Sequence, residues 1–189
     1  SIDTLNGRFG TGLGLFFLNE AEATEALNAH TPTLADSDKD GVVDEYVYFK
    51  LKELKKSVDE IFFVSNSKIK ANERAKLEQI VDTVYCRDNI GFDVWGYKEA
   101  MEIYGPEKLE HFDELILLNY TFFGPIFPFE EMFEWSQSQQ VDFWGVSDHK
   151  EVIPNPFTGE SILPRHIQSH FIAIRKNMFT SIEFKQYWK

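Results

Sequence analysis

The stretch RDNIGFDVWGYKEAM, residues 87–101, marks a place where a strand ends and a helix begins. The apolar residues 83–86 before it are typical of a short strand, and a helical pattern starts at Asp93 after a turn on Gly91. A cation, small polar side chains and a glycine are therefore concentrated at one junction. Ligands of open α/β sheets bind outside the carboxyl ends of strands, and helix N-termini favour anions such as phosphates.

The same pattern also fits a plain strand–turn–helix connection that binds nothing. In that interpretation Asp93 caps the helix, Trp95 packs in the core and Arg87 forms a surface ion pair. The rest of the chain has to decide between these two interpretations.

The composition is that of a globular chain. Of the 189 residues 43% are hydrophobic and 18 are phenylalanine, which is enough for one domain with a real core. The net charge of −12 argues against a nucleic-acid-binding surface, because such a surface needs a basic patch. The charge does not argue against a nucleotide ligand, which needs only local hydrogen-bond donors.

The composition also bears on the compartment. The lone cysteine, Cys86, excludes an internal disulfide and fits a reducing compartment. No apolar run is long enough for a transmembrane helix, and Leu13 to Leu18 is too short and lacks the basic residues of a signal peptide. These features predict a cytoplasmic protein or a cytoplasmic domain.

Strand-like and helix-like segments alternate along the chain. Strands are predicted at 13–18, 60–64, 83–86, 114–118, 142–146 and 170–175, and helices at 43–57, 71–80, 93–104, 129–140 and 180–188. Residues 20–35 have the composition of an insertion, and 154–164 that of a loop or hairpin. This alternation predicts a single α/β domain over residues 1–189, with a mostly parallel sheet between helices.

The predicted helix at 43–57 has an apolar stripe over a lysine-rich face. The residues of the stripe are Val43, Tyr46, Val47, Phe49, Leu51 and Leu54. We expect this stripe to pack on the sheet and the lysines to face water.

Four blocks in order resemble the rhamnan synthesis protein F family of bacterial cell-surface polysaccharide assembly. They are RDNIGFDVWGYKEAM, then ELILLNYTFFGPIFPFEEMF at 114–133, then DFWGV at 142–146 and RHIQSHFIAIRKNMF at 165–179, and residues 38–68 resemble the family's opening helix and second strand. The resemblance implies a GT-A-type three-layer sandwich. It also implies a glycosyltransferase that moves a sugar, rhamnose for example, from a nucleotide-diphosphate donor to a glycan or lipid-linked acceptor. Peripheral association with membrane assembly machinery is implied as well.

Under this resemblance the donor site lies at the carboxyl ends of successive strands. The residues implied are Ser65, Asn66, Arg87, Asn89, Gly91, Asp93, Tyr97 and Asn119. Arg87 is expected to neutralise the diphosphate, and Gly91 to let the backbone approach it closely. The alternative for Ser65 and Asn66 is a turn that only leads into the next helix.

The strand at 114–118 departs from the GT-A pattern. It ends in Asn119, Tyr120 and Thr121, where GT-A enzymes commonly have carboxylates that hold Mg²⁺ or Mn²⁺ on the diphosphate. Either the metal is held elsewhere, or arginine and backbone donors neutralise the diphosphate.

A transferase also needs a base for the acceptor hydroxyl, or a nucleophile if it retains configuration. Asp148 and Glu151 follow the strand DFWGV, and His166 lies in the last family block, so these three are the candidates. The alternative is that Asp148 and Glu151 are solvated loop charges and that His166 is a structural residue.

A second metal motif competes with this interpretation. Residues 36–44 reproduce the first nine positions of an EF-hand loop, with Asp36, Asp38 and Asp40 as calcium ligands. Position 12, which should be a glutamate, is Val47. The motif predicts at most a calcium-binding module.

The sequence is therefore compatible with three functions. The first is the glycosyltransferase domain, the second a non-catalytic nucleotide-sugar or glycan-binding domain, and the third the calcium-binding module. The chain ends one helix after its last predicted strand, whereas GT-A enzymes usually need further chain for the acceptor, so the resemblance implies an incomplete domain.

Overall fold

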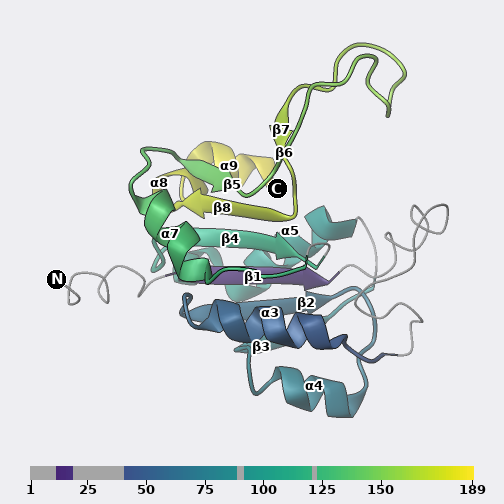
Figure 1. Ribbon diagram of the computed structural model, residues 1–189, viewed down its shortest axis with the longest axis vertical. Coiled ribbons are helices and arrows are strands. Elements are labelled where there is room, and N and C mark those ends of the chain that lie inside the picture. Colours follow the sequence, from purple (N-terminus) through teal and green to yellow (C-terminus); the bar gives the residue numbers. More distant parts are fainter. Residues whose placement is uncertain (1–11, 19–40, 89–91, 121–122) are drawn as a thin grey trace.

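The computed structural model describes residues 12–18, 41–88, 92–120 and 123–189 (Figure 1). The predicted insertion at 20–35 lies outside these residues. The strands are β1 (Gly12–Leu18), β2 (Glu60–Ser65), β3 (Thr83–Cys86), β4 (Glu114–Asn119), β5 (Phe143–Gly145), β6 (Asp148–His149), β7 (His166–Ile167) and β8 (Phe171–Arg175). The helices are α3 (Glu45–Lys55), α4 (Ala71–Leu77), α5 (Phe92–Tyr104), α6 (Pro106–Leu109), α7 (Phe129–Gln137), α8 (Lys176–Phe179) and α9 (Ile182–Tyr187). All the predicted strands and helices are confirmed, with ends shifted by a few residues.

A six-stranded sheet in the order β3-β2-β1-β4-β8-β5 forms the centre of the structure (Figure 1). The first four strands pair in parallel, for example Leu15 of β1 with Phe62 of β2 and with Leu117 of β4. β8 runs antiparallel to both of its neighbours, β4 and β5. A separate two-stranded antiparallel ribbon joins β6 and β7.

The predicted GT-A-type sandwich on a mostly parallel sheet is therefore wrong. Three of the strand pairings in the sheet are parallel, but both pairings of β8 are antiparallel, so the sheet is mixed. Parallel neighbours need a crossover connection, usually a helix. Residues 146–170 contain no helix and return directly from β5 into β8, so that strand is reversed.

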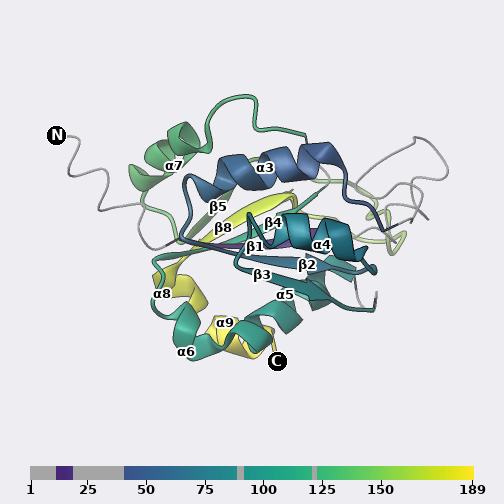
Figure 2. The same cartoon turned by 90° about the horizontal axis from the view of Figure 1, so that it is seen from below.

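Helices cover both faces of the sheet (Figure 2). α3, α4 and α7 lie on one face, and α5, α6, α8 and α9 on the other. Because successive side chains of a strand point to opposite faces, Phe63 of β2 packs under α3 while Phe62 packs under α5. The apolar runs of β2 and β4 are thereby buried on both sides.

α3 buries most of the predicted stripe, but it exposes Phe49 and buries Lys50. Lys50 is only 2% exposed, whereas Phe49 is 50% exposed. Lys50 lies three residues after Val47 and four before Leu54, so helical spacing places it on the buried face. The lysine-rich face therefore does not include Lys50.

Residues 147–168 form an arm that projects from the sheet beyond β5 and β8 (Figure 1). β6 and β7 form its base, and Val152 pairs with Leu163 further out. The base rests closely on Gly145, because a Cβ at that position would lie 2.3 Å from Ile167 Cγ2 and 2.7 Å from Phe171 O. In the part of the chain that the structure describes, no helix is long and apolar enough to cross a membrane.

We predict that Phe63→Ala lowers the free energy of unfolding by about 3–5 kcal/mol, because it opens a cavity in the centre of the sheet. Phe63 is fully buried, whereas Phe157, on the arm, is 85% exposed. Phe157→Ala is the matched control and should change the free energy by less than about 0.5 kcal/mol. Urea unfolding followed by circular dichroism measures both, and equal losses would contradict this account of the core.

Candidate functional site

The carboxyl ends of the parallel strands bring several predicted residues to one edge of the sheet. Asn66 follows β2, Arg87 follows β3 and Asn119 ends β4. Parallel pairing makes these strands end at the same edge, and Arg87 N donates a hydrogen bond to Ser65 O at 2.9 Å. The buried residues at this edge include Ser65, Asn66, Arg87 and Asn119.

Arg87 is the centre of a hydrogen-bonded group at this edge. Its Nε and Nη2 donate to the two carboxylate oxygens of Glu99 on α5, at 3.0 and 2.8 Å, and its Nη1 donates to Asn66 Oδ1 at 2.5 Å. The Arg87 side chain is 3% exposed and that of Glu99 is 30% exposed. The fork of the guanidinium matches the carboxylate, which makes this a strong, directional pair.

The hydrogen bonds from Arg87 hold the pKa of the Glu99 carboxyl below its usual range. Tyr85 on β3 also donates its hydroxyl to Glu99 Oε2 at 3.3 Å. Burial and the neighbouring Glu99 carboxylate raise the pKa of the Tyr85 hydroxyl, so Tyr85 stays a donor. Glu99 therefore balances the charge of Arg87 within the protein.

The Asn66 side chain is oriented by this group. Because its Oδ1 accepts from Arg87, its Nδ2 amide points elsewhere. Nδ2 is buried, and the residues that the structure describes offer it no hydrogen-bond acceptor. A buried amide without an acceptor is costly unless something else supplies one.

Three other predicted residues have contacts that shape the edge. Ser65 Oγ donates to Ser67 O at 2.9 Å and accepts from Ser67 N, a local turn that leads towards α4. Tyr97 is buried on α5 and donates its hydroxyl to Ser169 O at 3.4 Å. Asn119 N donates to His170 O at 3.2 Å, which joins the end of β4 to the start of β8.

Some predicted residues cannot be placed. Asn89, Gly91 and the calcium-loop residues Asp36, Asp38 and Asp40 lie outside the described residues. Of Asp93 only the backbone is described, in the first turn of α5.

The three predicted catalytic residues lie on the arm. Asp148 is exposed and forms an ion pair with Arg165, which lowers the pKa of the Asp148 carboxyl. Glu151 and His166 are exposed as well. β3 and β5 are the two outer strands of the sheet, so about five strand spacings, or about 24 Å, separate Arg87 from the base of the arm.

The sequence interpretation missed Lys50. Its Nζ donates to Tyr120 O at 3.3 Å, just past the end of β4, and lies 5.4 Å from the centre of the Tyr46 ring. Burial lowers the pKa of the Lys50 ammonium to about 7. The sequence does carry a signal for its burial, because helical spacing places Lys50 on the same face of α3 as Val47 and Leu54.

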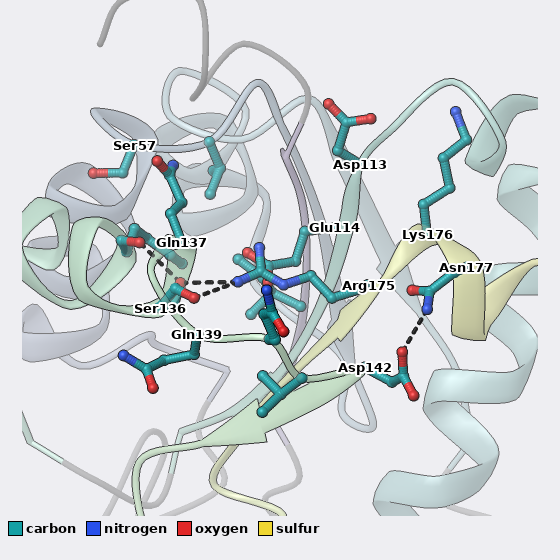
Figure 3. Close-up of a pocket in the computed structure, with 15 residues that line it drawn as sticks. Ser57, Asp113, Glu114, Ser136, Gln137, Gln139, Asp142, Arg175, Lys176 and Asn177 are labelled. Atoms are coloured by element: carbon teal, nitrogen blue, oxygen red, sulfur yellow. Dashed lines mark hydrogen bonds and ion pairs between the residues drawn. The ribbon is translucent and has the colours of Figure 1, made fainter.

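A polar hollow of about 790 Å³ lies at the opposite edge of the sheet, where β4 begins and β8 ends (Figure 3). Figure 3 shows Arg175 between Glu114 and Ser136. Arg175 Nη1 lies 3.1 Å from Glu114 Oε1, and Arg175 Nη2 donates to Ser136 O at 2.8 Å. Trp144 Nε1 also donates to Glu114, and burial raises the pKa of that carboxyl. These polar groups are paired with one another.

Within the described ranges, no group of three or more His, Cys, Asp or Glu side chains is placed to hold a metal ion. β4 ends in Asn119, as the sequence indicates, and not in a carboxylate. Mg²⁺, Mn²⁺ and Ca²⁺ therefore stay predictions of the sequence, and the calcium loop lies outside the described residues.

The family model described as rhamnan synthesis protein F matches residues 61–189. A protein of Sinorhizobium fredii (strain NBRC 101917 / NGR234), "Uncharacterized protein y4gN", is 22% identical over 147 residues. The aligned part is 77% of the present chain and 36% of that protein, so the chain spans about a third of the relative's length.

We predict that Glu99→Gln lowers the free energy of unfolding by about 1–3 kcal/mol at neutral pH, because a charged partner of Arg87 is lost. The folded-state pKa of Glu99 is depressed, so its stabilisation is present above the unfolded value of about 4.3 and is lost as pH falls through the folded value. Urea unfolding should therefore show the largest difference between the two proteins above that pH. A difference that persists unchanged in acid would contradict the ion-pair account.

Lys50 predicts a rise of stability with pH in a different, alkaline range. Between about pH 7 and about pH 10.4 the unfolded state holds a proton on Lys50 that the folded state lacks, so stability rises with pH by at most about 1.4 kcal/mol per unit. Lys50→Met should remove this rise in urea unfolding measured across that range. Lys52→Met, on the exposed side of the same helix, should leave the rise intact.

Proposed function

The chain belongs to the rhamnan synthesis protein F family, and on this premise we propose that it is a glycosyltransferase domain of polysaccharide synthesis. Its donor is a sugar, rhamnose by the family's description, on a nucleotide diphosphate. Its acceptor is a growing glycan or a lipid-linked saccharide. The donor site is the edge formed by Asn66, Arg87 and the start of α5.

The observation that carries this proposal is the Asn66 amide. Arg87 holds Asn66 Oδ1, and the buried Nδ2 finds no acceptor among the described residues. A phosphate or sugar oxygen of the donor supplies that acceptor. The backbone N–H groups in the first turn of α5 favour the diphosphate at the same place.

Arg87 has a different role from the one its charge alone indicates. Glu99 already balances the guanidinium, which is almost fully buried. Arg87 therefore acts as a positioning residue that fixes Asn66 and joins β3 to α5. The amide and the backbone donors, and not a free cation, contact the diphosphate.

In the transfer, an acceptor hydroxyl oxygen forms a bond to the anomeric carbon. The bond from that carbon to the diphosphate oxygen breaks, and the nucleotide diphosphate leaves with the electron pair. A base takes the hydroxyl proton. Asp148, Glu151 and His166 stay the candidates for this base. They lie about five strand spacings from Arg87 along the same edge of the sheet, so this role requires the bound donor to extend from Asn66 towards the arm.

A non-catalytic nucleotide-sugar-binding domain is the second candidate function. It is favoured by the end of β4, where Asn119 stands in place of a carboxylate. Chromatography of a mixture of the chain, a nucleotide-sugar donor and a saccharide acceptor separates the two functions. An enzyme releases free nucleotide diphosphate from the donor, whereas a binding domain leaves the donor intact.

We predict that the chain binds a UDP-, dTDP- or GDP-sugar in titration calorimetry and that Asn66→Asp weakens binding about 10–100-fold. An aspartate still accepts from Arg87, but it offers the donor no N–H and adds a negative charge near the diphosphate. The loss of a hydrogen bond to a charged group corresponds to about 1.5–3 kcal/mol.

The matched control makes the same change on the arm. Asn155 Oδ1 accepts from Phe157 N at 2.9 Å and can do so as an aspartate, so Asn155→Asp should leave donor affinity unchanged. Circular dichroism confirms that each variant is folded. Equal affinity of Asn66→Asp and the unaltered chain for every donor would contradict the proposed site.

A further inference from the structure

An apolar pocket lies among the helices on the α5 face of the sheet. It is formed by α5, α6, α8 and α9, which lie together on that side (Figure 2), and its volume is about 350 Å³. Met101, Leu109 and Phe179 are its buried lining, and Phe184 and Trp188 add partly buried rings. Ligand pockets of proteins are of this size and are lined mainly by apolar and aromatic side chains with a few polar groups.

One polar atom is buried in this apolar lining. Trp188 Nε1 carries a hydrogen, and the residues that the structure describes offer it no acceptor. Neighbouring rings hold the indole, since the ring centroids of Phe184 and Tyr187 lie 6.0 and 5.3 Å from that of Trp188. A buried indole N–H usually has a hydrogen-bond partner, and leaving it without one is costly. A ligand with an oxygen acceptor supplies that partner.

The rim of the apolar pocket is more basic than the rest of the chain. Its charged side chains are Lys98, Lys185, Lys189, Glu102 and Glu110, a net charge of +1 in a chain of net charge −12. Lys185 Nζ lies 3.0 Å from Glu110 Oε1, and Lys98 Nζ lies 4.0 Å from Glu102 Oε1. Such surface pairs are weak, and each ammonium has three donors, so the lysines can contact an anion as well. The rim therefore favours a ligand with a negative charge.

We propose that the apolar pocket binds a single-chain amphiphile with an anionic head group, a fatty acid or a lipid phosphate. The apolar chain lies against Met101, Leu109 and Phe179. An oxygen of the head group accepts a hydrogen bond from Trp188 Nε1, and the lysines at the rim balance its charge. A nucleotide sugar does not fit this lining, because its polar groups would face apolar side chains. The site is independent of the proposed donor site and shares no residue with it.

Titration calorimetry of the full chain with decyl phosphate, kept below its micelle concentration, tests the proposal. We expect saturable binding of one molecule, and weaker binding of hexyl phosphate, which buries less apolar surface. A parallel titration with decanoate separates the two sources, because the tighter of the two head groups identifies a lipid phosphate or a fatty acid. Decanol has the same chain without the charge and should bind at least about fivefold more weakly than the tighter anionic probe. Sodium chloride should weaken binding of the anionic probes relative to decanol.

The substitution Trp188→Phe tests the indole N–H, because it keeps an aromatic ring and removes the donor. We expect about tenfold weaker binding of the tighter anionic probe. Trp135→Phe is the matched control, because Trp135 is an exposed tryptophan of α7 on the opposite face of the sheet (Figure 2), and it should bind as the unaltered chain does. Circular dichroism shows whether each variant is folded.

The chain-length, head-group and salt comparisons use the unaltered chain, so they test the pocket even if Trp188→Phe does not fold. Absence of saturable binding of both anionic probes, or decanol binding as tightly as they do, would overturn the proposal. So would a folded Trp188→Phe that binds them with unchanged affinity. Displacement of the bound probe by a nucleotide sugar would also overturn it, because the probe would then occupy the donor site.

Discussion

Burial of the central strands on both faces is the constraint on which the rest of the structure depends. β2 and β4 carry continuous apolar runs, and helices cover each side of them. Polar groups have no place along such strands, so they gather where the strands end. The candidate donor site lies at one of these edges of the sheet, and the polar hollow lies at the other.

The carboxyl edge is organised by a buried cation and its partners. Breaking a buried ion pair leaves an uncompensated charge, so Arg87 and Glu99 keep each other in place. The pair fixes the relative position of β3 and α5, and it turns Asn66 so that Nδ2 has no acceptor among the described residues. The sequence suggests that Arg87 binds phosphate, whereas in the structure its guanidinium holds the side-chain amide of Asn66 in place.

The reversed strand β8 gives the edge its second feature. Because the chain returns from β5 to β8 without a helix, the connection becomes the arm, and the arm leaves from the same edge as the donor site. The family match covers residues 61–189, which include the edge, the arm and β8. The proposed donor site and the arm are thus different parts of one edge.

Much of the local structure follows from the sequence alone. The apolar runs and their spacing predicted the strand at 83–86 with its exact ends and the helices on either side of it, because hydrophobic period and turn residues act locally. The same pattern predicted that Asn66, Arg87 and Asn119 lie at strand ends. Family membership also followed from four blocks in order, and residues 61–189 match that family.

Only the tertiary structure decided how these pieces meet. Strand direction depends on which neighbours pair, so the antiparallel β8 could not be read from a strand–helix alternation, and the GT-A prediction failed there. Glu99 follows Arg87 by 12 residues across a turn, a spacing with no periodic signal, and its role appears only when α5 packs beside β3. Sequence patterns report local periodicity, whereas charge pairing and strand order are set by contacts between segments that the chain brings together only on folding.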